Sequence, residues 1–419
     1  MIDHVLHAPG RATVSDATSH LLPAGFSAMR TARLHLALQR HVDDGEVPGI
    51  VALVRHAGRE HVETLGTMAF GSETPVRRDT IFRLASTTKP ITAVAAMILV
   101  EECRLRLDDP LDNWLPELRS RRVLRRVDGP LDDTVPANRP ITLRDLLTFR
   151  SGYGDFALFA PASPFQQALA AAGLSISTWP YRGTPDEFVR RLGELPLAHQ
   201  PGERWLYHTS AEILGVLIAR VSGQPFGAFL RERIFEPLGM TDTGFHVPAA
   251  KLGRLPTCYG RDMATGALVV LDEPHGQYAR SPGFESGAGG LVSTVDDLLA
   301  FGRMMLGDCA HEAHILSRPT IELMRIDHLT AEQKALSPFF EGFWACRSWG
   351  LGLGIVTGRA EPADVPGRFG WDGAFGTSFW MDPKEGVVGV LMTQRRPDRL
   401  ALPPVVVDFW NSAYQLIDE

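Results

Sequence analysis

Short apolar runs of β-strand length lie near both ends of the chain. Two such runs, at 50–54 and 62–65, are separated by a turn signal and predict a β-hairpin. The same pattern returns late, where strands are expected at 377–381 and 387–392, before a terminal helix that begins near Pro404. Strands near both ends predict one sheet domain that is split in the sequence.

A helical period appears between these strands. In the stretch 87–105, apolar residues recur every three or four positions, and Pro90 falls in the opening turn, where its missing N–H costs little. Ser86 is therefore expected at the N-terminus of a helix. From Asp108 to about Glu285, short apolar-periodic segments alternate with connections rich in Pro and Gly. Short helices are predicted there at 143–149, 185–192 and 211–221.

These elements predict an α+β fold, in which an antiparallel sheet is flanked by helices and a second lobe is mainly helical. The expected organisation is an N-terminal extension at 1–27, a discontinuous sheet domain at 28–107 and 285–419, and a mainly helical domain at 108–284.

Composition and charge limit the kinds of partner that the protein is expected to bind. Forty-four per cent of the 419 residues are hydrophobic, enough for a large core, and 42 basic residues face 49 acidic ones. The formal charge of -7 offers no electrostatic footprint for nucleic acid. The longest near-continuous apolar run, 91–100, is about half of the roughly 20 residues that span a bilayer. Since residues 1–27 also lack a secretory pattern, we expect a cytoplasmic protein with no membrane partner, as a monomer or homo-oligomer.

Neither a metal site nor a cofactor is expected. The cysteines lie far apart and are expected to be buried or inert thiols. They are Cys103, Cys258, Cys309 and Cys346. His311 and His314 lack zincin spacing and a third ligand, which favours a surface helix. The absence of a Gly-x-Ser-x-Gly elbow argues against an α/β-hydrolase esterase.

Ser86 and Lys89 are the first candidate catalytic residues. Three positions apart at a helix start, their side chains project from one face with roughly 5–6 Å between Cβ atoms. A serine hydroxyl becomes a useful nucleophile when a base takes its proton, and an amine does so only when held neutral, below its ordinary pKa of about 10.4. The positive end of the helix disfavours the ammonium form of Lys89 and favours an oxyanion nearby.

Tyr207 is the third candidate. It precedes the predicted helix at 211–221, so its phenol stands at a second helix entrance, a position that is also typical of a core residue. Its ordinary pKa is about 10, so a neighbouring Lys89 and a helix dipole would be needed to make a phenolate useful near neutral pH.

A fourth feature is Trp371-Asp372-Gly373-Ala374, which leads into the strand at 377–381. Gly373 allows the backbone to approach a ligand closely, and the N–H of Ala374 is a candidate donor to an oxyanion. A tight turn before a hairpin would give the same pattern.

With these features in this order, the chain resembles the serine β-lactamase and penicillin-binding-protein superfamily, and most closely its class C β-lactamase-like esterases, the family VIII carboxylesterases. The resemblance covers roughly Gly49 to the C-terminus. It rests on Phe82-Arg83-Leu84-Ala85-Ser86-Thr87-Thr88-Lys89, Leu143-Arg144-Asp145-Leu146-Leu147-Thr148 before Ser151-Gly152, Tyr207 with Leu214-Gly215, Glu236-Pro237-Leu238-Gly239-Met240 and Gly376-Thr377-Ser378-Phe379-Trp380-Met381-Asp382-Pro383.

The resemblance implies a β-lactamase/transpeptidase-like fold with a catalytic cleft between the two lobes. Ser86 would attack the carbonyl, and Lys89 and Tyr207 would exchange its proton. The N–H groups of Ser86 and Ala374 would hold the oxyanion, and no cofactor would be required.

Two positions depart from the lactamase pattern. Thr209 stands where lactamases and transpeptidases usually carry an asparagine, and Trp371 replaces the Lys or His of their third motif. Trp371, Asp372, Gly373 and Thr209 are expected to bind substrate. The apolar face of Trp371 favours esters with apolar groups, and Asp372 disfavours anions. Replacing Trp371 is expected to change substrate choice more than stability.

The predicted function is that of a serine carboxylesterase that acts on small-molecule esters through a Ser86 acyl-enzyme, with weak β-lactamase activity as an accompaniment. An acyltransferase and a D-amino-acid amidase or peptidase use the same intermediate and stay open. A catalytically silent binding protein is a further alternative, because fold does not fix function.

Overall fold

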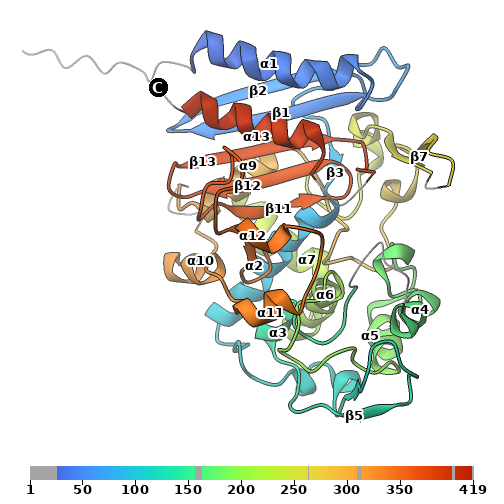
Figure 1. The fold of residues 1–419 in the computed structure, drawn as a ribbon. Helices are drawn as coiled ribbons and strands as arrows, with labels where there is room; N and C mark the ends of the chain where they lie inside the picture. The colour runs from blue at the N-terminus through green and yellow to red at the C-terminus, as the bar shows by residue number, and fades with distance from the viewer. Residues whose placement is uncertain (1–25, 156–162, 263, 309–313, 399–401, 418–419) are drawn as a thin grey trace, which may run out of the picture.

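The structure is a computed structural model that describes residues 26–155, 163–262, 264–308, 314–398 and 402–417. Within these ranges, its centre is an antiparallel sheet of seven strands with helices on both faces (Figure 1). In spatial order the strands are β2 (Arg59–Gly66), β1 (Gly49–His56), β13 (Val387–Thr393), β12 (Thr377–Asp382), β11 (Phe369–Gly373), β10 (Gly354–Val356) and β9 (Arg347–Trp349).

Helices cover both faces of the sheet because its central strands are apolar on both sides. Alternate residues of the run Ile50–Val54 on β1 belong to two different hydrophobic clusters. One cluster includes α1 (Ala28–Asp43) and α13 (Pro404–Ile417), which lie side by side on one face (Figure 1). On the other face, α9 (Val295–Met305) packs against β1, β12 and β13. The run predicted as a strand is thus apolar throughout because both of its sides are buried.

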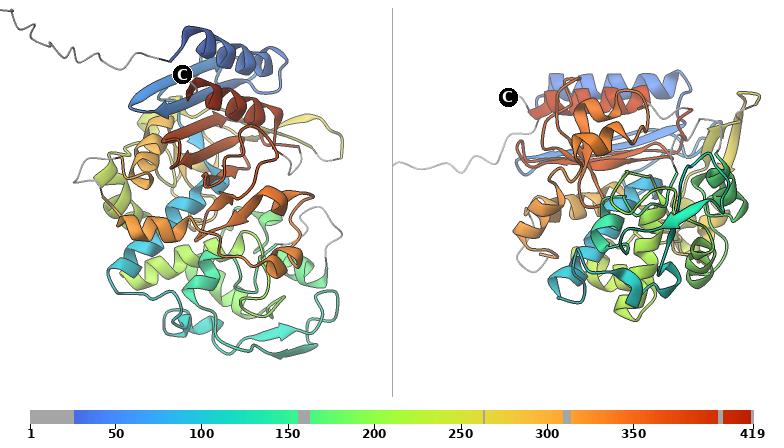
Figure 2. Two further views of the ribbon diagram at one scale, coloured as in Figure 1. Left: turned by 60° about the vertical axis from the view of Figure 1, so that its left-hand side comes forward. Right: turned by 60° about the horizontal axis from the view of Figure 1, so that its bottom comes forward.

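The remaining helices lie mainly below the sheet, on the side away from α1 and α13 (Figure 2). The buried α2 (Thr88–Glu101) runs beside α6 (Thr209–Ser222) and links the sheet to this lobe. The others are α3 (Leu143–Leu147), α4 (Pro164–Ala171), α5 (Pro185–Gly193), α7 (Phe226–Leu230), α8 (Glu236–Leu238), α10 (Arg318–Met324), α11 (Ala331–Ala335) and α12 (Phe343–Cys346).

Three short antiparallel pairs complete the described strands. They are β3 (Phe82–Arg83) with β8 (Val292–Ser293), β4 (Arg122–Leu124) with β5 (Thr134–Pro136), and β6 (Cys258–Arg261) with β7 (Leu268–Asp272). The last hairpin lies beside the sheet, where Tyr259 pairs with Arg395 just beyond β13. One hydrophobic cluster runs from the sheet through α2 into the helical lobe, so packing does not separate the two lobes. The domain boundaries at 107/108 and 284/285 therefore stay a prediction.

The predicted fold class is confirmed, and the predicted hairpins and terminal helix lie where expected. Several helix boundaries differ by a few residues: α3 ends at Leu147 instead of Phe149, and α6 begins at Thr209 instead of Ala211. The largest difference is that α2 ends at Glu101 instead of continuing to Leu105. Cys103 adopts a φ of 57°, a left-handed conformation that cannot continue a helix, although Leu105 preserves the apolar period.

Among the described helices, none is both long and apolar enough to cross a membrane alone. Only α6 taken together with the helical stretch Phe226–Leu238, across a bend of 79°, reaches that length and composition.

Candidate active site

Ser86 lies in a single turn of 3₁₀-helix, Ala85–Thr87, directly before α2. Ala85 has a φ of 46°, a conformation that few residues other than glycine adopt. The carbonyl oxygen of Leu84 accepts a hydrogen bond from Thr377 Oγ1 at 2.9 Å. This bond ties the turn to β12, so the sheet helps to fix the position of Ser86.

Lys89 meets Ser86 one turn further along, as the spacing predicted. Its Nζ donates hydrogen bonds to Ser86 Oγ at 2.9 Å and to the carbonyl oxygen of Ala288 at 2.6 Å. Lys89 is almost completely buried. Burial lowers the pKa of Lys89 to about 7, and the negative charge of Glu212 opposes part of this shift. A large fraction of the amine is therefore neutral near pH 7, and its lone pair can accept the Ser86 proton.

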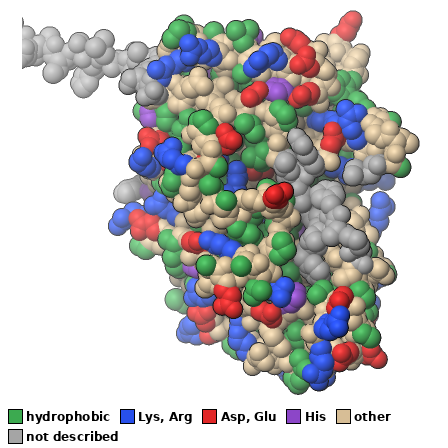
Figure 3. All heavy atoms as spheres, in the orientation of Figure 1, with side chains coloured by type: hydrophobic (Ala, Val, Ile, Leu, Met, Phe, Trp, Pro, Cys, Tyr) green, Lys and Arg blue, Asp and Glu red, His purple; other side chains and the backbone are tan. Residues whose placement is uncertain are grey.

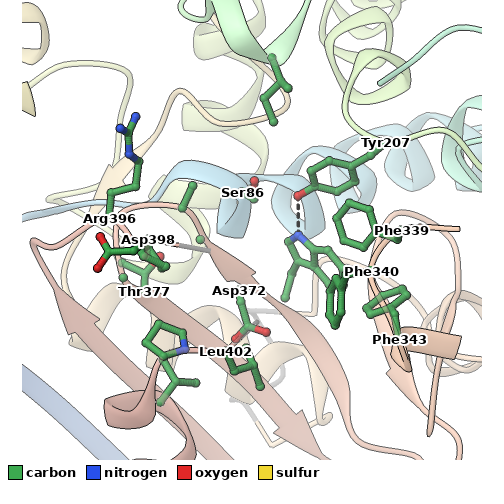
Figure 4. Close-up of a pocket in the computed structure, with 18 of the residues that line it drawn as sticks. Ser86, Tyr207, Phe339, Phe340, Phe343, Asp372, Thr377, Arg396, Asp398 and Leu402 are labelled. Atoms are coloured by element: carbon green, nitrogen blue, oxygen red, sulfur yellow. Dashed lines mark hydrogen bonds between the residues drawn. The ribbon is translucent and has the colours of Figure 1, made fainter. Parts of the chain in front are cut away.

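Tyr207 reaches the same place from the start of α6. Lys89 Nζ lies 4.6 Å from the centroid of the Tyr207 ring, and Figure 4 shows the phenol beside Ser86. Trp371 Nε1 donates a hydrogen bond of 2.7 Å to Tyr207 Oη. Burial raises the pKa of Tyr207, although hydrogen bonds with Ser86 and Trp371 oppose the shift. Tyr207 is therefore a protonated phenol at neutral pH, not a phenolate.

The backbone at His208 is strained in a way that presents Tyr207. His208 has φ 79° and ψ -66°, and the N–H of Thr209 donates to the carbonyl oxygen of Tyr207 at 3.1 Å. These values define a γ-turn of the rare, strained kind, whose central residue has positive φ. The turn separates Tyr207 from the body of α6. The backbone of Tyr207 also pairs with that of Asp155 in an isolated β-bridge.

The end of β11 brings the fourth predicted feature to the nucleophile. A Cβ atom on Gly373 would lie 2.2 Å from the carbonyl oxygen of Leu84 and 2.1 Å from Thr377 Oγ1. The close approach that requires glycine is therefore to the turn before Ser86, rather than to a ligand as the sequence suggested. Ala374 follows, exposed at the surface of the cavity.

A cavity of about 450 Å³ opens beside these groups (Figure 4). Ser86, Tyr207, Trp371 and Ala374 line one part of it. The rest of the lining is largely apolar or aromatic, with a few charged and polar side chains. It consists of Ile176, Ser177, Phe339, Phe340, Phe343, Arg347, Asp372, Gly373, Gly376, Thr377, Arg396, Pro397, Asp398, Leu402, Pro403 and Val406.

Trp371 and Thr209 differ from what the sequence led us to expect. The indole N–H of Trp371 is engaged by Tyr207, so it is not free for a substrate. Trp371 is 6% exposed and its ring centroid lies 4.7 Å from that of Trp349, so its replacement also removes core packing. Thr209 is fully buried, lies outside the cavity lining, and its Oγ1 has no hydrogen-bond partner among the described residues.

Asp372 lies in the cavity wall, but its carboxylate faces partners of its own. It accepts hydrogen bonds from Ser378 Oγ at 2.5 Å and Trp380 Nε1 at 2.9 Å, and Arg347 lies 3.9 Å away. Arg347 offsets the negative charge of Asp372, which weakens the expectation that this residue repels anions.

Sequence reasoning missed two groups of residues. The aromatic wall comes from a short stretch, Pro338-Phe339-Phe340-Glu341-Gly342-Phe343-Trp344, whose density of rings was a readable signal. Behind Lys89 lies the buried carboxylate of Glu212, surrounded by His208 and the segment 286–288. Glu212 looked like an ordinary polar position inside an apolar helix, and only the fold brings segment 286–288 to it.

None of the cysteines and histidines that the structure describes lines this cavity. Cys258 is buried, and burial raises the pKa of its thiol to about 11. Cys103 is exposed, because it lies in the turn that ends α2, so for this thiol only the expectation that it is inert stays open. Cys309 and His311 lie outside the described residues. Within the part that the structure describes, no group of three or more His, Cys, Asp or Glu side chains could hold a metal ion.

Charged side chains of both signs are interspersed on the face shown in Figure 3. No extended area of one sign covers the described surface in that view.

The chain belongs to the family described as Beta-lactamase, whose model matches residues 35–406. Protein Rv1367c of Mycobacterium tuberculosis (strain ATCC 25618 / H37Rv) is 39% identical over 366 residues, which cover 85% of this chain and 88% of the relative. Esterase EstB of Burkholderia gladioli is 29% identical over 401 residues, covering 91% and 95%. The solved structure of EstCE1, described as a hydrolase with promiscuous acyltransferase activity, has a TM-score of 0.76 at 24% identity and covers 92% and 98%.

These findings confirm the resemblance to the serine β-lactamase and penicillin-binding-protein superfamily and its esterase branch. They support a serine hydrolase or acyltransferase.

Proposed function

We propose that the protein is a carboxylesterase that forms an acyl-enzyme on Ser86 and favours esters with apolar groups. The observation that carries the proposal is the contact of 2.9 Å between Ser86 Oγ and a buried lysine whose pKa is lowered to about 7. A hydroxyl becomes a nucleophile when a positioned base removes its proton, and a neutral amine at this distance is such a base.

In the proposed acylation step, Ser86 Oγ attacks the ester carbonyl carbon while Lys89 takes the hydroxyl proton. Tyr207, held protonated, donates its proton to the leaving alkoxide as the bond between the carbonyl carbon and the alcohol oxygen breaks. The proton on Lys89 then replaces the one lost from Tyr207. In deacylation, water attacks the acyl carbonyl, its proton passes to this pair, and Ser86 leaves with a proton.

The oxyanion formed in each step needs donors aimed at one point. The backbone N–H groups of Ser86 and Ala374 are the proposed donors, because the end of β11 is held against the turn that carries Ser86. Such donors are worth roughly 2.7–4 kcal/mol each in comparable sites.

The cavity lining supports the proposed preference for apolar esters. Phe339, Phe340 and Phe343 lie together on one side of it (Figure 4), and Leu402 and Val406 add apolar surface to the lining. Apolar area buried by a substrate contributes about 25 cal/mol per Å². The same lining would also hold an apolar alcohol in place of water, so acyl transfer to an alcohol is the second candidate function.

The test is steady-state hydrolysis of p-nitrophenyl esters from acetate to octanoate, beside nitrocefin, with wild type and Ser86→Ala. We expect ester turnover that rises with acyl length, falls to background in the variant, and exceeds nitrocefin turnover. Ser317→Ala, which removes a serine on the exposed end of α10, is the matched control and should leave the rates unchanged.

Covalent labelling separates an enzyme from a silent binding protein. Wild type should gain the mass of a fluorophosphonate probe on Ser86, and Ser86→Ala should not. Full ester turnover in Ser86→Ala, or an unlabelled Ser86 in folded wild type, would refute the proposal. An added alcohol that yields its ester faster than hydrolysis occurs would favour the transferase.

A further inference from the structure

Glu212 is a buried carboxylate that lies behind the proposed catalytic groups and outside the cavity lining. It is 3% exposed on α6. Its oxygens accept a hydrogen bond of 2.7 Å from Ser286 Oγ and one of 3.3 Å from the N–H of Ala288, and His208 Nε2 lies 3.3 Å from Oε1. Burying a carboxylate costs free energy that several such partners must offset, so we expect this buried charge to have a specific role.

One side of this network leads to Lys89. The segment 286–288 is bound to Glu212, and its last carbonyl oxygen, that of Ala288, accepts the hydrogen bond of 2.6 Å from Lys89 Nζ. The segment lies directly on α6, because a Cβ atom on Gly287 would come within 2.4 Å of the carbonyl oxygen of Ala211. Glu212 therefore fixes the acceptor that aims the amine at Ser86.

The other side leads to Tyr207. His208, the central residue of the strained γ-turn, meets Glu212 one helical turn further along. A strained turn persists only where its surroundings over-determine it, and this contact is one of those constraints. The β-bridge between Tyr207 and Asp155 is another.

We propose that Glu212 is a positioning residue that holds both proton-transfer groups of the proposed esterase site, Lys89 through the Ala288 carbonyl and Tyr207 through His208. The inference rests on the proposed function. It assigns Glu212 no contact with the substrate.

The charge of Glu212 also has a measurable consequence for pH dependence. Three charged or titratable groups lie around Lys89: Glu212 on α6, His208 directly before α6, and Tyr207. Two more lie further away, Asp155 beside His208 and Asp372 beside Tyr207. Removing the negative charge makes the ammonium form of Lys89 less favourable. The activity that requires neutral Lys89 then extends to lower pH.

The experiment compares Glu212→Gln with a matched control, Asp297→Asn, in kcat, KM and the pH profile of kcat/KM for p-nitrophenyl butyrate. Asp297 is also a buried carboxylate that accepts bonds from a hydroxyl, Thr243 Oγ1 at 2.7 Å, and a backbone N–H, that of Asp242 at 2.8 Å. It lies at the start of α9, away from the cavity lining. Each variant is checked for its melting temperature and for labelling of Ser86 by a fluorophosphonate.

We expect Glu212→Gln to lower kcat by about 10²-fold, as misplacement of a catalytic group does, with little change in KM. The acid limb should move to lower pH by about one unit, the smaller end of the effect of one nearby charge. Asp297→Asn should lower the melting temperature and leave the pH profile in place. An unshifted limb in Glu212→Gln, with a kcat loss no larger than that of the control, would overturn the inference.

If Glu212→Gln does not fold, Ser286→Ala provides the second test, because it removes the bond of 2.7 Å while keeping the charge. Ser286→Ala should lower kcat about tenfold and leave the acid limb of the kcat/KM pH profile where it is in wild type. An unchanged kcat would overturn the inference. Failure of the proposed function looks different, because wild type itself would then lack Ser86 labelling and ester turnover.

Discussion

The position of Gly373 makes the sharpest prediction about the oxyanion donors. Its φ lies outside the left-handed region, so the change Gly373→Ala introduces no backbone strain and acts only through the added Cβ. That atom would lie 2.2 Å from the Leu84 carbonyl oxygen and 2.1 Å from Thr377 Oγ1, whereas ordinary contacts begin near 3.4 Å. The strand and the turn carrying Ser86 must therefore separate by about 1 Å.

A shift of this size moves the Ala374 N–H away from the point where the oxyanion forms. Losing one such donor costs about 10²–10³ in kcat, or roughly 2.7–4 kcal/mol. We expect Gly373→Ala to lower kcat for p-nitrophenyl butyrate by that factor. The KM should change less, because the apolar lining is left intact.

The control is Gly253→Ala, since a Cβ there would meet no atom within 4 Å and the backbone is ordinary. It should match wild type in kcat and melting temperature. If Gly373→Ala is folded and keeps a kcat within about twofold of wild type, the reasoning about the close approach and the donor is wrong.

Four further predictions concern the proton-transfer pair, Trp371 and the cavity. The kcat/KM should rise with pH through about 7, because Lys89 must lose its proton to act as a base, and a profile flat from pH 5 to 9 would contradict this assignment. Trp371→Phe keeps a ring but removes the hydrogen bond to Tyr207, so kcat should fall by roughly two- to tenfold, as expected for about 0.5–1.5 kcal/mol. In thermal melts, Trp371→Ala should lose about 3–5 kcal/mol of stability, and an unchanged melting temperature would show that its packing matters little. Phe340→Ala should widen the cavity and shift the preferred p-nitrophenyl ester toward longer acyl chains, which an unchanged chain-length profile would exclude.

Local patterns predicted the elements of the site better than they predicted its contacts. The spacing of Ser86 and Lys89 and the apolar helix behind them were enough to predict their contact, because both residues belong to one helix start. The joining of Tyr207 to Ser86 was expected only through the resemblance to a family, since the two are far apart in the sequence.

The contacts that the sequence could not predict join residues from different segments of the chain. No local signal showed that the Trp371 indole N–H would be engaged by Tyr207 or that Gly373 would lie against Leu84. The lowered pKa of Lys89 likewise follows from complete burial, which results from packing of α2 against α6 and the sheet.

The strained turn at His208 has a consequence for attempts to make the protein more thermostable. A residue held in such a conformation costs about 1–3 kcal/mol, which a substitution such as His208→Gly would relieve. Variants selected for heat resistance alone would therefore accumulate at this turn, and they would lose the contact between His208 and Glu212 that helps to hold Tyr207 in place. A selection that also requires ester turnover would keep the strain, since stability and activity make opposite demands on this one residue.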